Sequence, residues 1–335
     1  MLRFLLGAML GAALGAGAVW LDAQRVLNAP SAAGALVEVA PGAGLKDVAR
    51  TLAANGLAPG RARLYLVLYA RLTRQDRDLK SGEFEVPAGR TPIEVLAQIV
   101  AGRTKQYALT FIEGWRFEQA LQALRANPAV RHTLADDRPQ TAMAALGHPD
   151  LSGEGHLLPD TYLFPRGTPD VTLLREAYAA MDAALAQEWE GRDAQLPYGA
   201  PIDALTMASI VEKETGAVGE RPQIAGVFVR RLRKHMKLQT DPTVIYGLGA
   251  AYDGNLRRRD LLRDTPYNSY TRYGLPPTPI CLPGRAALHA ALHPAGGDAL
   301  YFVSRGDGTH YFSATLAEHA AAVRKYQILP NRHRS

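Results

Sequence analysis

The sequence predicts an α+β protein that consists of an N-terminal transmembrane helix, a small αβ module and a larger mixed α/β domain. Three observations support this order. An uninterrupted apolar run lies close to the N-terminus, short strand and helix patterns follow it, and the remaining two thirds combine helical patterns with turn-rich polar segments. The length of 335 residues is enough for two globular domains behind the first helix.

The apolar run extends from Phe4 to Leu21 and contains no charged side chain. As a helix it would be about 27 Å long, which is close to the thickness of the hydrocarbon layer of a bilayer. Arg3 precedes the run, and this charge favours a cytoplasmic N-terminus. We therefore expect an uncleaved anchor over residues 1–22, a linker over 23–35, and export of the rest of the chain.

A cleaved signal peptide is the alternative interpretation, because small residues occupy positions 15–18. The apolar run continues beyond them to Leu21, however, and is longer than the usual apolar region of a signal peptide.

The small αβ module is expected over residues 36–104. Alternating apolar residues predict strands, and apolar residues at helical spacing predict helices. Thr91, Pro92 and Glu94 have the types and spacing of a capped helix start. The expected elements are a strand at Val37–Val39, helices at Leu45–Asn55 and Leu64–Leu72, a strand at Gly82–Val86, and a helix from Thr91.

The larger domain is expected over residues 105–330. It should begin with a strand at Tyr107–Ile112, and helices are expected at 116–126, 170–189 and 203–216. In the last of these, Asp203 is suited to cap the start and Gly216 to end the helix. The densest turn and polar segments follow this helix.

The net charge of +6 permits an acidic partner such as a cell-wall polymer or anionic lipid. The densest basic cluster, Arg230 to Lys237, is expected to be a solvated helix face, and no zinc-finger spacing or basic heptad accompanies it. We therefore expect no nucleic-acid partner. The single cysteine, Cys281, cannot form an intrachain disulfide and is expected to be a small buried residue.

Two carboxylates, Glu212 and Glu214, lie near the C-terminus of the 203–216 helix. At about 100° per residue they point to different faces, and Glu214 shares its face with Met207, Ile210 and Val211. An apolar environment and the negative end of the helix dipole should both raise the pKa of Glu214. A carboxyl group with a raised pKa is suited to act as a general acid at neutral pH. Two solvated carboxylates are the alternative.

Two later segments combine amide, hydroxyl, carboxylate and phenol groups, which suits the hydroxyls and C–H faces of sugar rings. The first includes Gln239, Asp241 and Tyr246, and Pro242 is expected to hold Asp241 in an extended conformation. The second includes Asn268 and Tyr270. The alternative interpretation is ordinary loops with capping polar groups.

Other catalytic motifs are missing from the sequence. His289 and His293 are four residues apart on an expected helix, but no His-Glu-x-x-His motif is present. There is no Gly-x-Ser-x-Gly motif and no glycine-rich phosphate-binding loop with Lys-Ser/Thr. We therefore expect no metal site and no cofactor, and a structural role for single histidines such as His310.

A set of segments in a particular order carries a family resemblance. These segments are Glu113–Gly114, Glu154–Tyr162, Ala208–Thr215, Glu220–Arg221, Leu238–Gly247, Tyr267–Tyr270, Gly274–Pro277 and His293–Pro294. With the expected anchor, they resemble the YceG-like endolytic murein transglycosylases over nearly the whole chain. The sequence departs from the family pattern at Ile112, Thr278 and Leu282, where proline, glycine and asparagine are usual.

The resemblance implies a LysM-like module at 36–104 and a transglycosylase catalytic domain at 105–330. It implies cleavage of the β-1,4 bond between N-acetylmuramic acid and N-acetylglucosamine inside nascent peptidoglycan strands, with a 1,6-anhydro product and Glu214 as the essential residue. Sugar positioning is expected from Gln239, Asp241, Tyr246, Asn268, Tyr270 and Glu154.

The resemblance also implies a single-pass protein of the bacterial inner membrane with its catalytic domain in the periplasm. Wall synthases of the penicillin-binding class are expected partners at the family level. Two alternatives stay open. One is a hydrolase that uses Asp241 or Glu154 as a second carboxylate, and the other is a non-catalytic wall-binding or division scaffold.

Overall fold

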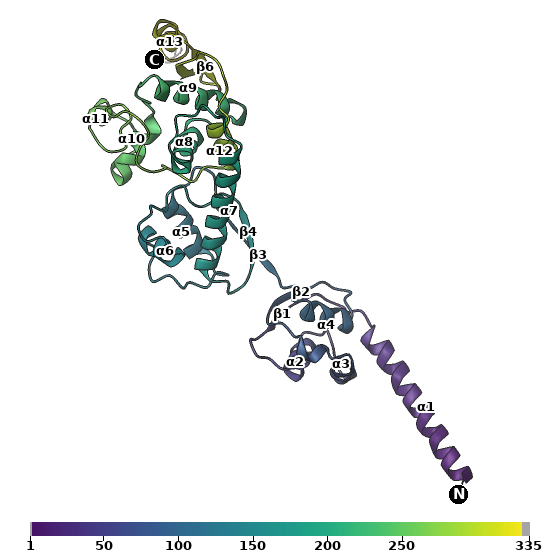
Figure 1. The fold of residues 1–335 in the computed structure, drawn as a ribbon. Helices are drawn as coiled ribbons and strands as arrows, with labels where there is room; N and C mark the ends of the chain where they lie inside the picture. The colour runs from purple at the N-terminus through teal and green to yellow at the C-terminus, as the bar shows by residue number, and fades with distance from the viewer. Residues whose placement is uncertain (1, 330–335) are drawn as a thin grey trace. The chain divides into compact units, whose positions relative to one another are not determined.

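The computed structural model describes residues 2–329 and divides into two compact units. The first unit contains the chain up to Tyr107 together with Leu163–Gly167, and the second contains Ala108–Tyr162 and the chain from Thr168 onward. In the described range, the strands form three two-stranded sheets, β1–β2, β3–β4 and β5–β6. The class is therefore α+β, as predicted (Figure 1).

The N-terminal helix α1 (Leu2–Leu27) is longer than the predicted anchor and includes the first part of the predicted linker. Leu27 is buried in the core of the first unit. Asp22 accepts a hydrogen bond from the Tyr65 hydroxyl at 2.8 Å and pairs with Arg61 at 3.2 Å. Among the residues whose side chains the structure describes, no helix combines the length and apolarity needed to cross a membrane.

The remaining elements of the first unit match the predicted module closely. They are β1 (Ala35–Val39), α2 (Leu45–Ala54), α3 (Arg61–Leu72), β2 (Gly82–Val86) and α4 (Pro92–Val100). Strands β1 and β2 pair antiparallel, with Val37 opposite Phe84, and both of these side chains are fully buried. The predicted cap is present: Thr91 accepts from the Glu94 amide at 3.3 Å, and Glu94 accepts from the Thr91 amide at 2.9 Å.

Strands β3 (Gln106–Thr110) and β4 (Thr161–Pro165) pair with each other, and each contributes residues to both units. The second unit is mainly helical and carries the β5–β6 hairpin near its end. Its elements are α5 (Phe117–Ala126), α6 (Pro139–Leu146), α7 (Asp170–Glu190), α8 (Pro201–Glu214), α9 (Arg221–Arg233), α10 (Asp241–Leu248), α11 (Arg258–Leu262), α12 (Arg285–Leu292), β5 (Tyr301–Ser304), β6 (His310–Ser313) and α13 (Leu316–Val323).

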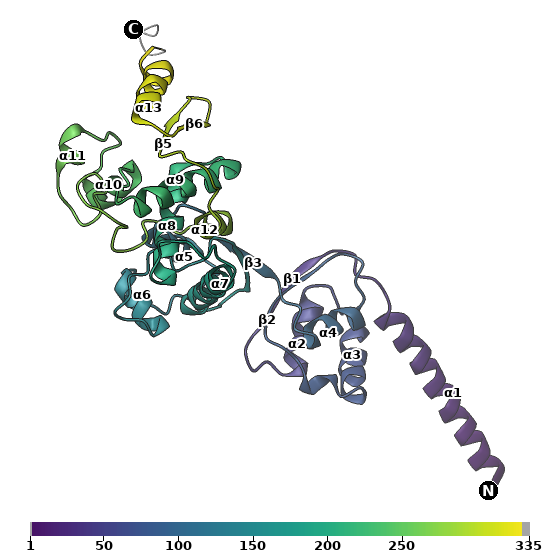
Figure 2. The same ribbon diagram turned by 45° about the horizontal axis from the view of Figure 1, so that its top comes forward.

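Helix α8 is the central element of the second unit. Every residue from Ala204 to Val211 is buried, and α8 packs against α7, α9 and α12, which lie around it in both views (Figures 1 and 2). The helix starts at Pro201, two residues before the predicted start. A proline in the first turn costs no helical hydrogen bond, and Asp203 reaches back to accept from the amides of Gly199 and Ala200.

The end of α8 also differs from the prediction. The helix ends at Glu214 because Thr215 has an extended backbone, so Gly216 does not form the cap. Glu214 is consequently the last helical residue, at the point where the chain leaves the core. This places its carboxylate at the boundary between the packed interior and a surface cavity.

The surroundings of Cys281 and Arg231 test two further predictions. Cys281 is fully buried, as predicted, and its thiol lies 3.3 Å from the Ser209 carbonyl oxygen. Arg231 contradicts the prediction of a solvated basic face, because it is only 8% exposed. Its guanidinium donates to the carbonyls of Leu300 and Leu238, both at 2.7 Å.

Candidate functional site

A cavity of about 490 Å³ lies in the second unit at the end of α8. Glu214, Gln239, Asp241 and Tyr270 line it, so four of the seven predicted site residues come together in one place. The other lining residues come from α9, the loop between α9 and α10, the β5–β6 hairpin and the helical segment beyond it. They are Arg231, Leu238, Tyr301, Phe302, Val303, Ser304, His310, Leu316, His319, Val323 and Gln327.

Glu214 is the half-buried carboxylate of this cavity. Its pKa is raised to about 7, chiefly because burial removes water from the charged form, and the nearby charge of Asp241 adds to the rise. The hydrogen bond from Thr240 and the positive electrostatic influence of His310 and Arg231 act in the opposite direction. A carboxyl group with this pKa can donate and accept a proton near neutral pH.

A buried network of hydroxyl groups fixes the segment that faces Glu214. The Thr240 hydroxyl donates to Oε1 of Glu214, while the Thr240 amide donates to the Ser269 hydroxyl at 3.0 Å. The Thr243 hydroxyl lies 2.8 Å from the same Ser269 hydroxyl. Gln239 has a φ of +50°, a conformation that is strained for a residue with a side chain, and its backbone amide donates to the Ser269 carbonyl at 3.1 Å.

Asp241 and Tyr270 form a second pair on the cavity wall. The Tyr270 hydroxyl donates to Oδ1 of Asp241 at 2.5 Å. Burial raises the pKa of Tyr270 above its ordinary value. Asp241 is the first residue of α10, which corrects the prediction of an extended conformation. Pro242 lies in the first turn of that helix, where its missing N–H costs nothing.

Arg231 and His310 are cavity residues that were not predicted as such. Glu220 holds His310 by accepting from its amide at 2.9 Å and by contacting Nδ1 at 2.8 Å. The position of Arg231 could have been inferred from spacing, since it lies three residues after Phe228 and seven after Ile224, which are buried on the same helix. Thr240 was missed although it lies between two predicted site residues.

Glu212 is also buried, with a side chain that is only 5% exposed, but it has a different environment from Glu214. Its carboxylate pairs with Arg221 at 2.8 Å and accepts from the Gly284 amide at 3.0 Å. Arg221 contacts Glu113 as well, at 3.3 Å. Glu212 is thus a member of a buried ionic network, and it does not line the cavity.

Glu154 and Tyr246, which were predicted to contact substrate, lie together outside the cavity lining. The Tyr246 hydroxyl donates to Glu154 at 3.2 Å, and the Phe117 amide at the start of α5 donates to the same carboxylate at 2.9 Å. Burial raises the pKa of Glu154 to about 7. The carboxylate caps α5, and in the described structure it is not part of the Glu214 site.

Asn268 does not line the cavity either, and its side chain forms hydrogen bonds with the backbone of its own loop. Its amide nitrogen donates to the carbonyls of Asp260, Leu261 and Arg263, and its oxygen accepts from the Tyr270 amide at 2.9 Å. Asn268 is 1% exposed, and its side chain is held within this loop next to the Tyr270 backbone.

Among residues 2–329, the side chains that could jointly hold a metal ion are Glu188, His289 and His293, and none of them lines the cavity.

The sequence model of the YceG-like family matches residues 37–325. A protein of Bacillus subtilis named endolytic murein transglycosylase is 41% identical over 175 residues, which are 52% of this chain and 48% of that protein. A protein of the same name from Streptococcus pneumoniae strain D39 is 27% identical over 91% of this chain and 61% of its own length. The chain thus spans about half to three fifths of these curated relatives.

The fold also resembles a solved structure. The crystal structure of a YceG-like protein from Listeria monocytogenes has 28% sequence identity and a TM-score of 0.54, and the match covers 87% of this chain and all of that one.

Proposed function

We propose that this chain, which belongs to the YceG-like family, is an endolytic murein transglycosylase that cleaves the glycan strands of peptidoglycan. The names of the two bacterial relatives support the activity. The observation that carries the proposal for this chain is the Glu214 carboxyl group, which lines an open cavity and has a pKa of about 7.

In the proposed reaction, protonated Glu214 donates its proton to the glycosidic oxygen between N-acetylmuramic acid and N-acetylglucosamine. The bond breaks through an oxocarbenium-like state at C1 of the muramic residue. The carboxylate of Glu214 then accepts the proton of the muramic C6 hydroxyl, whose oxygen bonds to C1. The products are a 1,6-anhydro-muramyl end and a free 4-hydroxyl on the departing sugar.

One carboxyl group is sufficient for this sequence, because the nucleophile belongs to the substrate and no water needs activation. Asp241 and Tyr270 are proposed to bind hydroxyl or amide groups of the sugars, together with Gln239. Asn268 is proposed to act indirectly, through the backbone position of Tyr270. Glu154 and Tyr246 retain a proposed contact with more distant sugar units of the strand.

A hydrolase is the second candidate, because Asp241 lines the same cavity and its charge influences Glu214. Such an enzyme would use Asp241 to activate water and would leave reducing ends. Glu154 is a weaker candidate for this role, because it lies outside the cavity lining and is held by Phe117.

We further propose that the apolar N-terminal segment anchors the protein in the bacterial inner membrane, with the second unit in the periplasm. The absence of charge from Phe4 to Leu21 supports this proposal. The first unit is proposed to be the LysM-like module of the family resemblance, and wall synthases are proposed as partners.

Mass spectrometry of the products from uncrosslinked glycan strands tests the reaction type. The proposal expects 1,6-anhydro ends from the full chain in detergent. Reducing ends would show a hydrolase, and strand binding without cleavage would favour a non-catalytic scaffold.

A further inference from the structure

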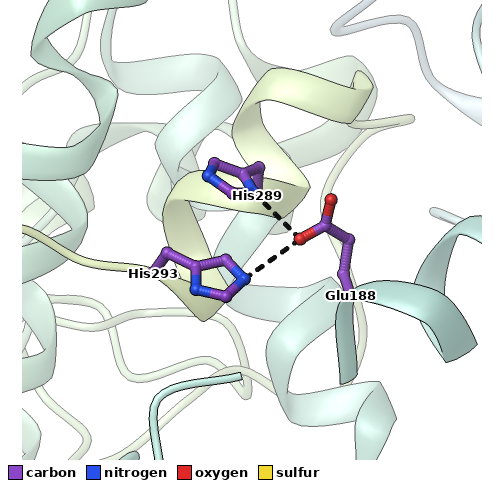
Figure 3. A group of neighbouring side chains, drawn as sticks. All are labelled: Glu188, His289 and His293. Atoms are coloured by element: carbon purple, nitrogen blue, oxygen red, sulfur yellow. Dashed lines mark hydrogen bonds and ion pairs between the residues drawn. The ribbon is translucent and has the colours of Figure 1, made fainter. Parts of the chain in front are cut away.

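Two histidines and a glutamate converge on the surface of the second unit, at the C-terminal ends of two packed helices. Oε2 of Glu188 lies 2.9 Å from Nδ1 of His289 and 3.2 Å from Nε2 of His293. The two rings stack with their centroids 4.3 Å apart. Figure 3 shows both rings directed toward the same carboxylate oxygen.

The fold holds these side chains in place through contacts that are independent of them. His289 lies in the last turn of α12, and His293 follows that helix, with its amide donating to the His289 carbonyl at 2.8 Å. The spacing of four residues places both rings on one side of the helix. Glu188 lies in the last turn of α7, and the Asp193 amide just beyond donates to the Leu292 carbonyl at 3.1 Å, which ties the two helix ends together.

We propose that Glu188, His289 and His293 bind one divalent transition-metal ion, with Zn²⁺ as the best fit. Two imidazole nitrogens and one carboxylate oxygen are a ligand set that zinc uses, with bonds of about 2.0–2.2 Å. Bonds of that length at tetrahedral angles separate neighbouring ligand atoms by about 3.3 Å. The observed separations of 2.9 and 3.2 Å are close to this value, so small side-chain movements would open the space for an ion.

The donor atoms select the kind of ion. Imidazole nitrogen suits zinc, copper(II) and nickel(II), whereas magnesium and calcium prefer sites made entirely of oxygen. Neither ring nitrogen that faces Glu188 can carry a proton while it binds a metal, so a bound ion would replace the contacts between these nitrogens and Glu188. The side chains of His289, His293 and Glu188 are 58%, 32% and 27% exposed, which leaves room for a water molecule as the fourth ligand.

The position of the cluster indicates a structural function for the ion. Helices α7 and α12 both pack on α8, the helix that ends in Glu214, and both also pack on each other. A bound ion would cross-link the C-terminal ends of α7 and α12 from outside this core. The site is separate from the Glu214 cavity, so metal binding and glycan cleavage can be measured independently.

The test is titration calorimetry with Zn²⁺ on the full chain in detergent, purified without a polyhistidine tag and stripped with a chelator. The expected result is one saturable zinc ion per chain and a rise in the thermal unfolding midpoint on zinc addition. His289→Gln, His293→Gln and Glu188→Gln should each weaken binding by at least about tenfold, because even residues that only orient metal ligands contribute that much. The exposed residue His132 offers a matched control, His132→Gln, which should bind as the unchanged protein does.

Zinc affinity that is the same in the unchanged protein and in the cluster variants, or no binding at millimolar zinc, would overturn the proposal. X-ray absorption spectroscopy of the zinc-loaded unchanged protein gives a result that does not depend on any variant. Scattering from two imidazoles would support the site, and a spectrum without imidazole would overturn it.

Discussion

The hydroxyl of Thr240 donates a hydrogen bond to the carboxylate of Glu214, and this bond joins the end of the central helix α8 to the residue that precedes α10. The bond stabilises the charged form of Glu214, whereas burial and the charge of Asp241 stabilise the neutral form. The pKa of about 7 is the balance of these effects, and each can be removed separately.

Thr240→Val should raise the pKa of Glu214, because it removes the hydrogen bond that favours the carboxylate. The upper limb of the pH–rate profile, where Glu214 loses the proton that it must donate, should move to higher pH. We also expect a loss of about tenfold or more in kcat, since the carboxylate loses an orienting contact. Initial rates of strand cleavage across the pH range measure both effects.

Thr206→Val is the matched control for this variant. Thr206 is a buried threonine of α8 whose hydroxyl donates to the Ile202 carbonyl at 2.8 Å. Its upper pH limb should stay where it is in the unchanged protein. An unchanged limb in Thr240→Val would contradict the assigned balance.

Asp241→Asn should shift the same limb in the opposite direction. It removes a negative charge that opposes ionisation of Glu214, so the pKa of Glu214 should fall and activity should decline at lower pH. Parallel shifts in Asp241→Asn and Thr240→Val would be inconsistent with their opposite electrostatic effects. If the unchanged protein forms reducing ends and Asp241→Asn forms none, the hydrolase is supported instead.

Arg221→Met should destabilise the protein by about 3–5 kcal/mol, because it leaves the Glu212 carboxylate buried without its ionic partner. Adding Glu212→Gln should restore part of the loss, since the uncompensated charge is then removed. Chemical denaturation of the single and double variants measures the effect. The exposed pair of Arg50 and Asp47 is the comparison, and Arg50→Ala should cost no more than about 1 kcal/mol.

The raised pKa of Glu214 also predicts a pH dependence of stability. The folded protein binds the proton of Glu214 more tightly than the unfolded chain, in which the pKa is near 4.5. Its contribution is therefore fully present below about pH 4.5 and is lost as pH rises through about 7. Glu214→Gln cannot ionise at this position. Between pH 5 and pH 8, its unfolding free energy should therefore rise by about 1–3 kcal/mol relative to that of the unchanged protein. A constant difference would contradict the raised pKa.

Local patterns predicted most of the first unit and several helices of the second. The Thr91–Glu94 cap and the alternation in Gly82–Val86 depend on neighbours in sequence, so the helix start and the strand could be predicted without knowledge of the tertiary structure. Helix α8 begins and ends two residues earlier in the sequence than predicted. The start depends on Asp203 reaching backwards, and the end depends on the extended backbone of Thr215.

The choice between Glu212 and Glu214 could not be decided on helical faces alone. Residues Ala204–Val211 of α8 are all buried, so the helix has no single apolar face that distinguishes one carboxylate from the other. Their environments differ because Arg221 reaches Glu212 while Thr240 reaches Glu214, and the packing of α8 with later segments determines both contacts. The cluster of Glu188, His289 and His293 could not be predicted from local patterns either, because 101 residues separate Glu188 from His289.

The most direct measurement is the rate of glycan-strand cleavage by Glu214→Gln, compared with the unchanged protein and with Glu118→Gln, which alters an exposed glutamate of α5. Glutamine keeps the shape of the side chain but can neither donate nor accept the proton. We expect a loss of at least about a hundredfold in Glu214→Gln and an unchanged rate in Glu118→Gln. Near-normal turnover by a folded Glu214→Gln variant would contradict the assignment of Glu214 as the catalytic acid.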